Sequence, residues 1–183
     1  MNLNLFKTQN NNSSVKVHAL YATGRNGEMG KADGTLPWRT PQNKIRKDLP
    51  PEIIKQCEDD MILFKNLTTE NVIIMGYNTF KTFSSPLPRR INIVIDRYIS
   101  ETEYVISENI WNFFPSMETA ISKCSSTFPG KEIFIIGGSK ILHEAFSKNL
   151  ITGKILHTII DADFPDATVY YCENNFTKNK IKP

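Results

Sequence analysis

The chain has 183 residues, of which 40% are hydrophobic, and its 22 Lys and Arg against 19 Asp and Glu give a net charge of +3. This length suits one domain built around a single core. The basic residues are dispersed, whereas nucleic-acid-binding domains usually gather them into one stripe, so no nucleic-acid partner is expected. No apolar run approaches the roughly 20 residues that span a bilayer, and the N-terminus does not resemble a signal peptide. We therefore expect a cytoplasmic protein with no membrane partner.

The cysteines and histidines are too widely spaced to suggest a disulfide scaffold or a metal site. The residues concerned are Cys57, Cys124, Cys172, His18, His143 and His157. We therefore expect no bound metal.

The first half of the chain begins with a polar segment, residues 1–14, which is expected to be a flexible tail. A strand is predicted over 15–22, and the Gly-rich segment 23–35 is predicted to be a long loop, a kind of segment that is often functional. The polar segment 39–51 ends in two prolines, after which apolar residues at three- and four-residue steps predict a helix over 52–66.

The second half alternates between strands and helices. Strands are predicted over 72–75, 91–95, 132–136 and 154–160, with helices over 78–83, 117–127 and 139–148. This alternation predicts an α/β domain, residues 15–183, with a mainly parallel sheet.

Two of the predicted strands end in glycine where a helix begins. One is followed by Gly137, Gly138 and Ser139, and the other by Gly76, with Thr79 in the next helix. Glycine lets a ligand approach the backbone, and a helix N-terminus offers free N–H groups to phosphate. Two such places at strand ends suit a dinucleotide, although each alone equally fits a tight turn.

The remaining candidate functional residues have charged side chains. Asp60 lies one helical turn before Phe64, beside the apolar stripe, where partial burial would favour its protonated form and suit it to proton transfer. Its neighbour Asp59 is expected to point elsewhere, and the alternative for either residue is an exposed helix carboxylate. Arg90 and Arg97 flank the strand 91–95, too far apart to bind one group. Each can hold a carboxylate or a phosphate, although each alone fits a solvated surface arginine better.

Taken in chain order, these pieces resemble dihydrofolate reductase from Val15 to Thr168. The resemblance is carried by Gly30, Asp33-Gly34, Leu36-Pro37-Trp38, Asp60-x-x-x-Phe64-Lys65, Val72 to Gly76, Thr79-Phe80, Leu87-Pro88-x-Arg90-x-Asn92, Arg97 and Ile136-Gly137-Gly138. It implies a mostly parallel, eight-stranded central sheet flanked by helices, with NADPH and dihydrofolate meeting in a cleft.

The resemblance also implies roles on the substrate side. Asp60 would bind the pterin and support protonation at N5, Thr158 would hydrogen-bond Asp60, and Trp38 would hold an ordered water beside it. Ala22 would reach both the nicotinamide and the pterin through its backbone. The remaining substrate-binding residues would be Phe64 against the pteridine, Arg90 at the α-carboxylate, Lys65 and Leu87.

On the cofactor side, the resemblance implies that Arg97 lies by the 2′-phosphate, which makes NADPH the expected donor. The loop from Gly24 to Trp38 would act as a lid over the nicotinamide. The other cofactor-binding residues would be Gly30, Gly76, Thr79, Ile136, Gly137, Gly138 and Ser139.

Several features depart from the family pattern. Residues 39–59 are longer than the usual link and are interpreted as a surface insertion before or extending the helix. Ala167 stands where the family has an acid, which would weaken lid closure. The chain is C-terminally short and is expected to lack the last hairpin of the sheet.

Three functions follow from these observations. We favour an active NADPH-dependent reductase of dihydrofolate. A truncated, non-catalytic homologue that binds ligand is an alternative, as is a reductase of the riboflavin-pathway type, against which Asp60 and Arg90 argue. The sequence does not show an association with a thymidylate synthase.

Overall fold

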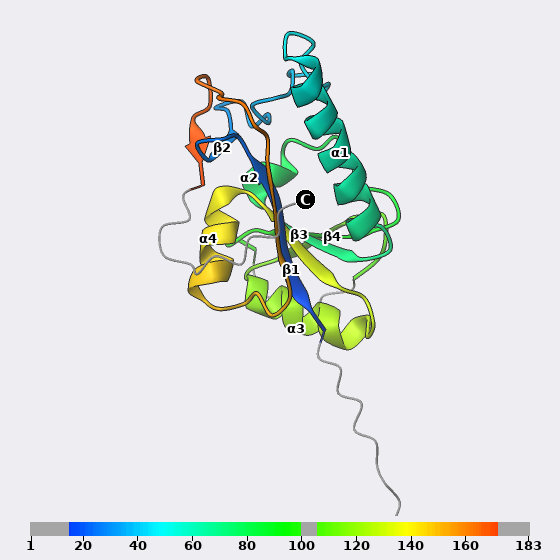
Figure 1. Ribbon diagram of the computed structural model, residues 1–183. Helices are drawn as coiled ribbons and strands as arrows, with labels where there is room; N and C mark the ends of the chain where they lie inside the picture. The colour runs from blue at the N-terminus through cyan, green and yellow to red at the C-terminus, as the bar shows by residue number, and fades with distance from the viewer. Residues whose placement is uncertain (1–14, 100–105, 172–183) are drawn as a thin grey trace, which may run out of the picture.

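The computed structural model describes residues 15–99 and 106–171, and its centre is a six-stranded parallel sheet (Figure 1). The strands follow the order β5-β4-β3-β6-β1-β7 across the sheet. Their bounds are Val17–Thr23 (β1), Val72–Gly76 (β3), Ile91–Ile95 (β4), Trp111–Phe114 (β5), Ile133–Gly137 (β6) and Ile155–Ile159 (β7). A separate antiparallel pair, β2 (Glu28–Gly30) and β8 (Val169–Tyr170), lies beyond the carboxyl end of β1.

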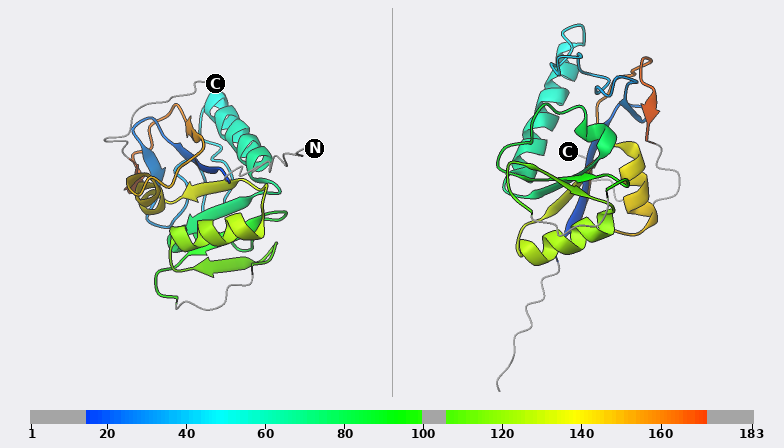
Figure 2. Two further views of the ribbon diagram at one scale, coloured as in Figure 1. Left: turned by 90° about the horizontal axis from the view of Figure 1, so that it is seen from below. Right: turned by 180° about the vertical axis from the view of Figure 1, so that it is seen from behind.

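Helices cover both faces of this sheet, so the fold has three layers (Figures 1 and 2). Strands β3 and β4 are buried along their whole length, as their unbroken apolar runs require in a parallel sheet covered on both sides. The helices are α1 (Pro51–Thr68), α2 (Tyr77–Phe80), α3 (Met117–Thr127) and α4 (Ser139–Ser147).

Side chains that alternate along the strands divide between two core clusters. Ile74, Ile93 and Ile135 pack with residues of α3 and α4 in one cluster. Ile73, Val94 and Phe134 point to the opposite face, where side chains of α1 and α2 cover them. The period of two along a strand therefore determines which helix each residue contacts.

A β-bulge ends the central strand β6. Ile74 of β3 pairs with Ile135, but the next pair joins Met75 to Gly137, so Ile136 is an extra residue. Bulges of this kind redirect a strand at its end. Gly137 follows with a φ of 117°, a backbone conformation that side chains disfavour, and a cis peptide bond joins it to Gly138 at the start of α4.

The predicted α/β class is confirmed, and all nine predicted helices and strands are present. Their bounds lie within a few residues of those expected, apart from the second helix, which ends early at Phe80. A single eight-stranded sheet was wrong for the described residues, because six strands form the sheet and two form the separate pair. The predicted loop 23–35 contains β2, and β5 was not predicted. The expected tail (1–14) and the residues after 171 lie outside the described residues.

Asn112 explains why β5 was not predicted, because the prediction of strands relied on unbroken apolar runs. Asn112 interrupts the strand, yet it is 6% exposed, and its amide nitrogen donates to the backbone oxygens of Asn92 and Ser107. A buried amide with its hydrogen bonds satisfied is tolerated within a sheet. The hydrogen-bond partners that make it tolerable are not visible in the sequence.

The segment before β4 is held by a second buried asparagine. The Asn92 side chain accepts from the backbone N–H of Leu87 at 2.9 Å and donates to the backbone oxygens of Leu87 and Arg90 at 2.9 and 3.0 Å. Since Asn92 is fully buried, its removal leaves backbone groups without partners.

We predict that Asn92→Ala lowers the free energy of unfolding by about 2–4 kcal/mol, since it leaves buried polar groups unsatisfied and opens a cavity. Urea denaturation followed by circular dichroism measures this change. The exposed Asn66→Ala in α1 is the control, with an expected change within about 0.5 kcal/mol. Equal effects of the two substitutions would contradict the anchoring role of Asn92.

Candidate functional site

Asp60 lies midway along α1, where the helix passes the edge strand β7. Its carboxylate is half-buried and hydrogen-bonds with the hydroxyl of Thr158 on β7. Thr158 is paired in parallel register with Ala22 of β1. Asp60, Thr158 and Ala22 were expected to share one site. They come from α1, β7 and β1 and lie together at the carboxyl end of the sheet.

The surroundings of Asp60 favour a bound proton. Burial raises the pKa of its carboxyl above the usual value, and this effect outweighs the opposing hydrogen bond from Thr158 and the positive charge of Arg39. A carboxyl that keeps its proton to higher pH than an exposed one is suited to holding and passing a proton.

Apolar residues form the wall beside this carboxyl. Trp38 is 1% exposed and packs in a cluster with Ile53, Cys57 and Phe164, against which Ala22 also lies. Burial, together with the charge of Asp60, raises the pKa of the Cys57 thiol to about 11. Cys57 is therefore a packing residue, because the reactive form of cysteine is the thiolate.

The segment 39–59, interpreted above as a surface insertion, includes the first half of α1 and is not confined to the surface. Arg39 is 7% exposed and pairs with Ile45 in an isolated β-bridge. Its Nη1 donates to the backbone oxygen and Oδ1 of Asn43 at 2.6 and 2.9 Å. Ile45 and Leu49 pack against the Trp38 cluster, so the segment folds back onto this cluster.

Arg90, which the resemblance assigns to the substrate, is held at the end of α1. Arg90 is 6% exposed, and its Nε donates to Oγ1 of Thr68 at 2.8 Å. Its guanidinium lies 6.0 Å from the centre of the Phe64 ring, and Phe64 is one helical turn beyond Asp60. Acid, ring and cation therefore follow one another along α1, and Lys65 is exposed beside them.

The two glycine-ended strands also meet, as the pattern predicted for a dinucleotide site. A Cβ on Gly138 would lie 3.2 Å from Oγ1 of Thr79, which places the start of α4 against α2. A Cβ on Gly76 would lie 2.7 Å from Cγ1 of Ile141, so only glycine lets α4 approach the end of β3 this closely. Ser139 begins α4, where free N–H groups favour phosphate.

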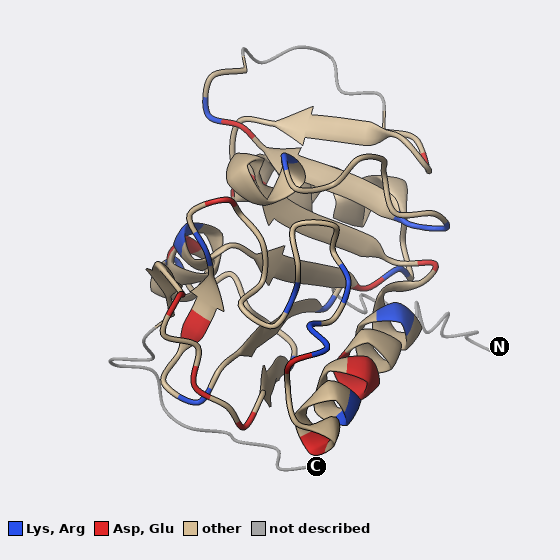
Figure 3. Cartoon of the chain, turned by 90° about the horizontal axis from the view of Figure 1, so that it is seen from above, with Lys and Arg blue, Asp and Glu red and all other residues tan. Residues whose placement is uncertain are grey.

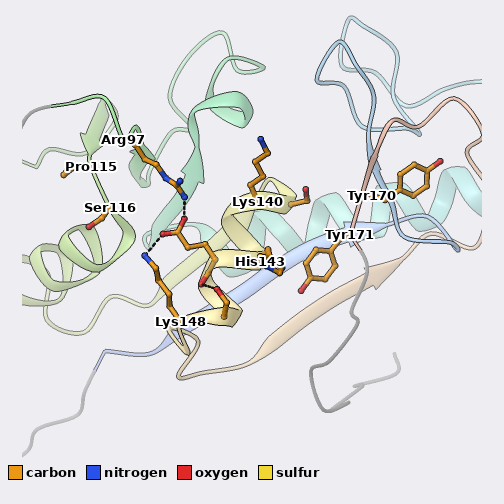
Figure 4. Close-up of a pocket in the computed structure, with 11 residues that line it drawn as sticks. Arg97, Pro115, Ser116, Lys140, His143, Lys148, Tyr170 and Tyr171 are labelled. Carbon is orange, nitrogen blue, oxygen red and sulfur yellow. Dashed lines mark hydrogen bonds and ion pairs between the residues drawn. The ribbon is translucent and has the colours of Figure 1, made fainter.

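A cavity of 780 Å³ continues from this helix start along the outer side of α4 (Figure 4). Arg97, which follows β4, lines it together with Lys140, His143 and Lys148 of α4. Arg90 and Arg97 lie at opposite ends of β4, and that they serve different groups stays a prediction. The sequence did not indicate Glu144, which forms an ion pair with Arg97 inside this cavity.

The segment expected to form the lid contains the short strand β2, and an ion pair of Lys31 helps to hold it in place. Gly30 of β2 accepts a hydrogen bond from the backbone N–H of Thr168 at 2.9 Å. Asp166 forms ion pairs with Lys31 at 2.8 Å and with Arg46 of the insertion at 3.6 Å. The resemblance implies an acid at the position of Ala167. Its neighbour Asp166 supplies a negative charge beside the segment expected to form the lid.

The described residues offer little support for other classes of site. They contain no group of three or more His, Cys, Asp and Glu residues that could hold a metal ion. None of their helices is long and apolar enough to cross a membrane. Basic and acidic positions alternate over the face shown in Figure 3, with no continuous basic stripe in that view.

Comparison with known proteins agrees with this geometry. Residues 49–182 match the family model described as dihydrofolate reductase. The chain is 30% identical to the dihydrofolate reductase of Haemophilus influenzae over 163 residues, which cover 89% of this chain and 82% of that protein. It is 29% identical to the Bacillus subtilis dihydrofolate reductase over 157 residues, 82% of this chain and 76% of that protein.

A third relative is larger. The bifunctional dihydrofolate reductase-thymidylate synthase of Paramecium tetraurelia is 32% identical over 93 residues, which are 50% of this chain but 18% of that protein. Because the family model covers most of the chain and the matched residues include Asp60, Arg90 and the Gly137-Gly138 turn, this chain belongs to the dihydrofolate reductase family.

Proposed function

We propose that this chain reduces 7,8-dihydrofolate to tetrahydrofolate with NADPH, with a hydride added at C6 and a proton at N5 of the pterin. The observation that carries the proposal is the half-buried Asp60, hydrogen-bonded to Thr158 beside Ala22. Such a site needs a proton donor and precise orientation but no metal or covalent nucleophile, since the cofactor supplies the hydride when it is bound.

The residues around α4 fit the cofactor. In this proposal Thr79, Gly137, Gly138 and Ser139 hold its phosphates, because they surround the helix start where N–H groups are free. Arg97 holds the 2′-phosphate and Ala22 meets the nicotinamide through its backbone. Gly30, Gly76 and Ile136 complete the cofactor contacts from the lid and the ends of β3 and β6.

The residues along α1 fit the substrate. Asp60 accepts hydrogen bonds from the pterin's amino group and ring nitrogen, Phe64 packs on the ring, and Arg90 holds the α-carboxylate of the glutamate tail. The order of these groups along α1 supports this assignment, because it matches the order of ring and carboxylate in the substrate. Leu87 and Lys65 border the tail.

Proton delivery to N5 is assigned to the surroundings of Asp60. The raised pKa of the carboxyl favours sharing a proton with the bound pterin. Thr158 fixes the carboxylate orientation, and Trp38 bounds the space in which a water can relay the proton. The insertion and the lid limit access of bulk water, which strengthens electrostatic interactions within the site.

We predict that Asp60→Asn lowers kcat near neutral pH about 100-fold or more, because general acid catalysis contributes at least that much. Loss of NADPH absorbance in the presence of dihydrofolate measures the rate. The residual rate should increase as the pH falls, since the solvent must then supply the proton. Asp59→Asn, which removes an exposed carboxylate paired with Lys55, is the matched control and should leave kcat unchanged.

These assays also separate the alternatives. A folded wild-type protein that binds NADPH without oxidising it when dihydrofolate is added would support the non-catalytic homologue. Turnover of a ribosylated pyrimidine in place of dihydrofolate would support the riboflavin-pathway type. Equal rates for wild type and Asp60→Asn at pH 7 would remove Asp60 from proton delivery.

The same substitution should make the protein more stable at neutral pH. The folded-state pKa of Asp60 is raised, so the unfolded chain releases this proton at lower pH than the folded one. The native state therefore loses stability as the pH rises through the unfolded pKa, about 3.9. We expect a higher Tm for Asp60→Asn at pH 7 and a difference that shrinks toward pH 4, measured by calorimetry. A lower Tm at pH 7 would contradict this.

Two glycines allow the cofactor contact to be tested separately from backbone strain. Gly137 (φ 117°) and Gly130 (φ 96°) both have positive φ, and a Cβ on either meets no atom within 4 Å. Alanine at either position should cost about 1 kcal/mol of stability. We predict that only Gly137→Ala weakens NADPH binding, about tenfold or more, because its methyl group fills the space the phosphates need.

Fluorescence titration with NADPH and thermal unfolding measure the two effects. If Gly130→Ala weakens binding as much as Gly137→Ala does, backbone strain rather than a local cofactor contact is the cause.

A further inference from the structure

The cavity beside α4 combines several cations with one carboxylate. Arg97, Lys140 and Lys148 line it, with His143 between them in the sequence of α4. Glu144 is the one acidic residue among the described residues that line it. A cavity with these cations next to a helix start fits a ligand with several negative charges, which raises the question of what Glu144 does there.

Glu144 binds two of these cations directly. Its Oε2 accepts from Nη2 of Arg97 at 2.5 Å, and its Oε1 accepts from Nζ of Lys148 at 2.7 Å (Figure 4). The Glu144 side chain is 14% exposed. Burial opposes its ionisation, but the two cations hold its pKa below the usual value. Glu144 therefore keeps its negative charge at neutral pH.

Arg97 is the more exposed member of the pair. Its side chain is 71% exposed, and its ion pair among the described residues is with Glu144. An anionic group that reaches this guanidinium meets a carboxylate already bound to it. Two negative groups on one cation repel each other, and the repulsion is stronger in a partly buried site than in water.

We propose that Glu144 determines how strongly the site prefers NADPH over NADH. By holding Arg97, its carboxylate weakens binding of the cofactor that carries a 2′-phosphate, and it leaves the affinity for the cofactor without this phosphate unchanged. This inference rests on the proposed function, in which Arg97 faces the 2′-phosphate. Removing the carboxylate should therefore increase the selectivity.

Lys148 allows Arg97 to exchange its partner Glu144 for a phosphate. When the phosphate takes Arg97, Glu144 keeps its hydrogen bond with Lys148, so no buried carboxylate is left unpaired. Lys148 also forms an ion pair with Glu118 at 2.7 Å. Glu118 is outside the cavity lining and has no contact with Arg97, so it offers a matched control of the same charge on the same lysine.

The test compares dissociation constants of NADPH and NADH for the full chain, with 2′,5′-ADP and 5′-AMP as shorter probes of the same difference. The variants are Glu144→Gln, Glu144→Ala, Glu118→Gln and Arg97→Met, each checked for folding by circular dichroism. We expect both Glu144 variants to raise the NADPH preference about five- to tenfold by tightening NADPH alone. Glu118→Gln should leave the preference unchanged, and Arg97→Met should abolish most of it.

The outcomes distinguish this inference from the proposed function. If Arg97→Met loses the preference but both Glu144 variants keep the wild-type value, the cofactor site stands and the inference about Glu144 is wrong. A lower preference in the Glu144 variants also overturns it, because Glu144 would then position Arg97 for the phosphate. If Arg97→Met changes nothing, the assignment of the 2′-phosphate to Arg97 fails, and the inference fails with it.

Discussion

Parallel pairing of β1 with β7 is the constraint on which the candidate site depends. It places Ala22 beside Thr158, and Thr158 in turn fixes the carboxylate of Asp60 on α1. A shift of this register by one residue would turn Thr158 toward the other face of the sheet. Backbone hydrogen bonds thus align the edge strand β7 with β1, and the side-chain hydrogen bond between Thr158 and Asp60 joins helix α1 to them.

Much of this arrangement could be predicted from the sequence, because the signals are local or ordered along the chain. The buried strands β3 and β4 are unbroken apolar runs, and Pro51 begins α1. Asp60 and Phe64 are separated by one helical turn, which places both on the same side of α1. The glycines at 137 and 138 indicated a close approach of ligand to backbone, and Gly137 does have a positive φ.

The remainder depends on contacts between distant segments, which residue patterns do not encode. Asn112 is acceptable in β5 only because Asn92 and Ser107 accept from its amide. Arg39 is buried only because the insertion folds back onto the Trp38 cluster. The contact between Arg97 and Glu144 joins β4 to α4 across 47 positions. A pattern that lists charges along the chain cannot show which of them neutralise one another.

The shared carboxylate of Asp166 links two segments, the glycine-rich segment through Lys31 and the segment after Trp38 through Arg46. Asp166 is itself half-exposed, at 47%, so dissolved ions screen both contacts together. The half-buried hydrogen bond between Asp60 and Thr158 is screened less by the same ions. Raising the ionic strength therefore weakens the contacts of Lys31 and Arg46 with Asp166 together, and affects the hydrogen bond of Asp60 less.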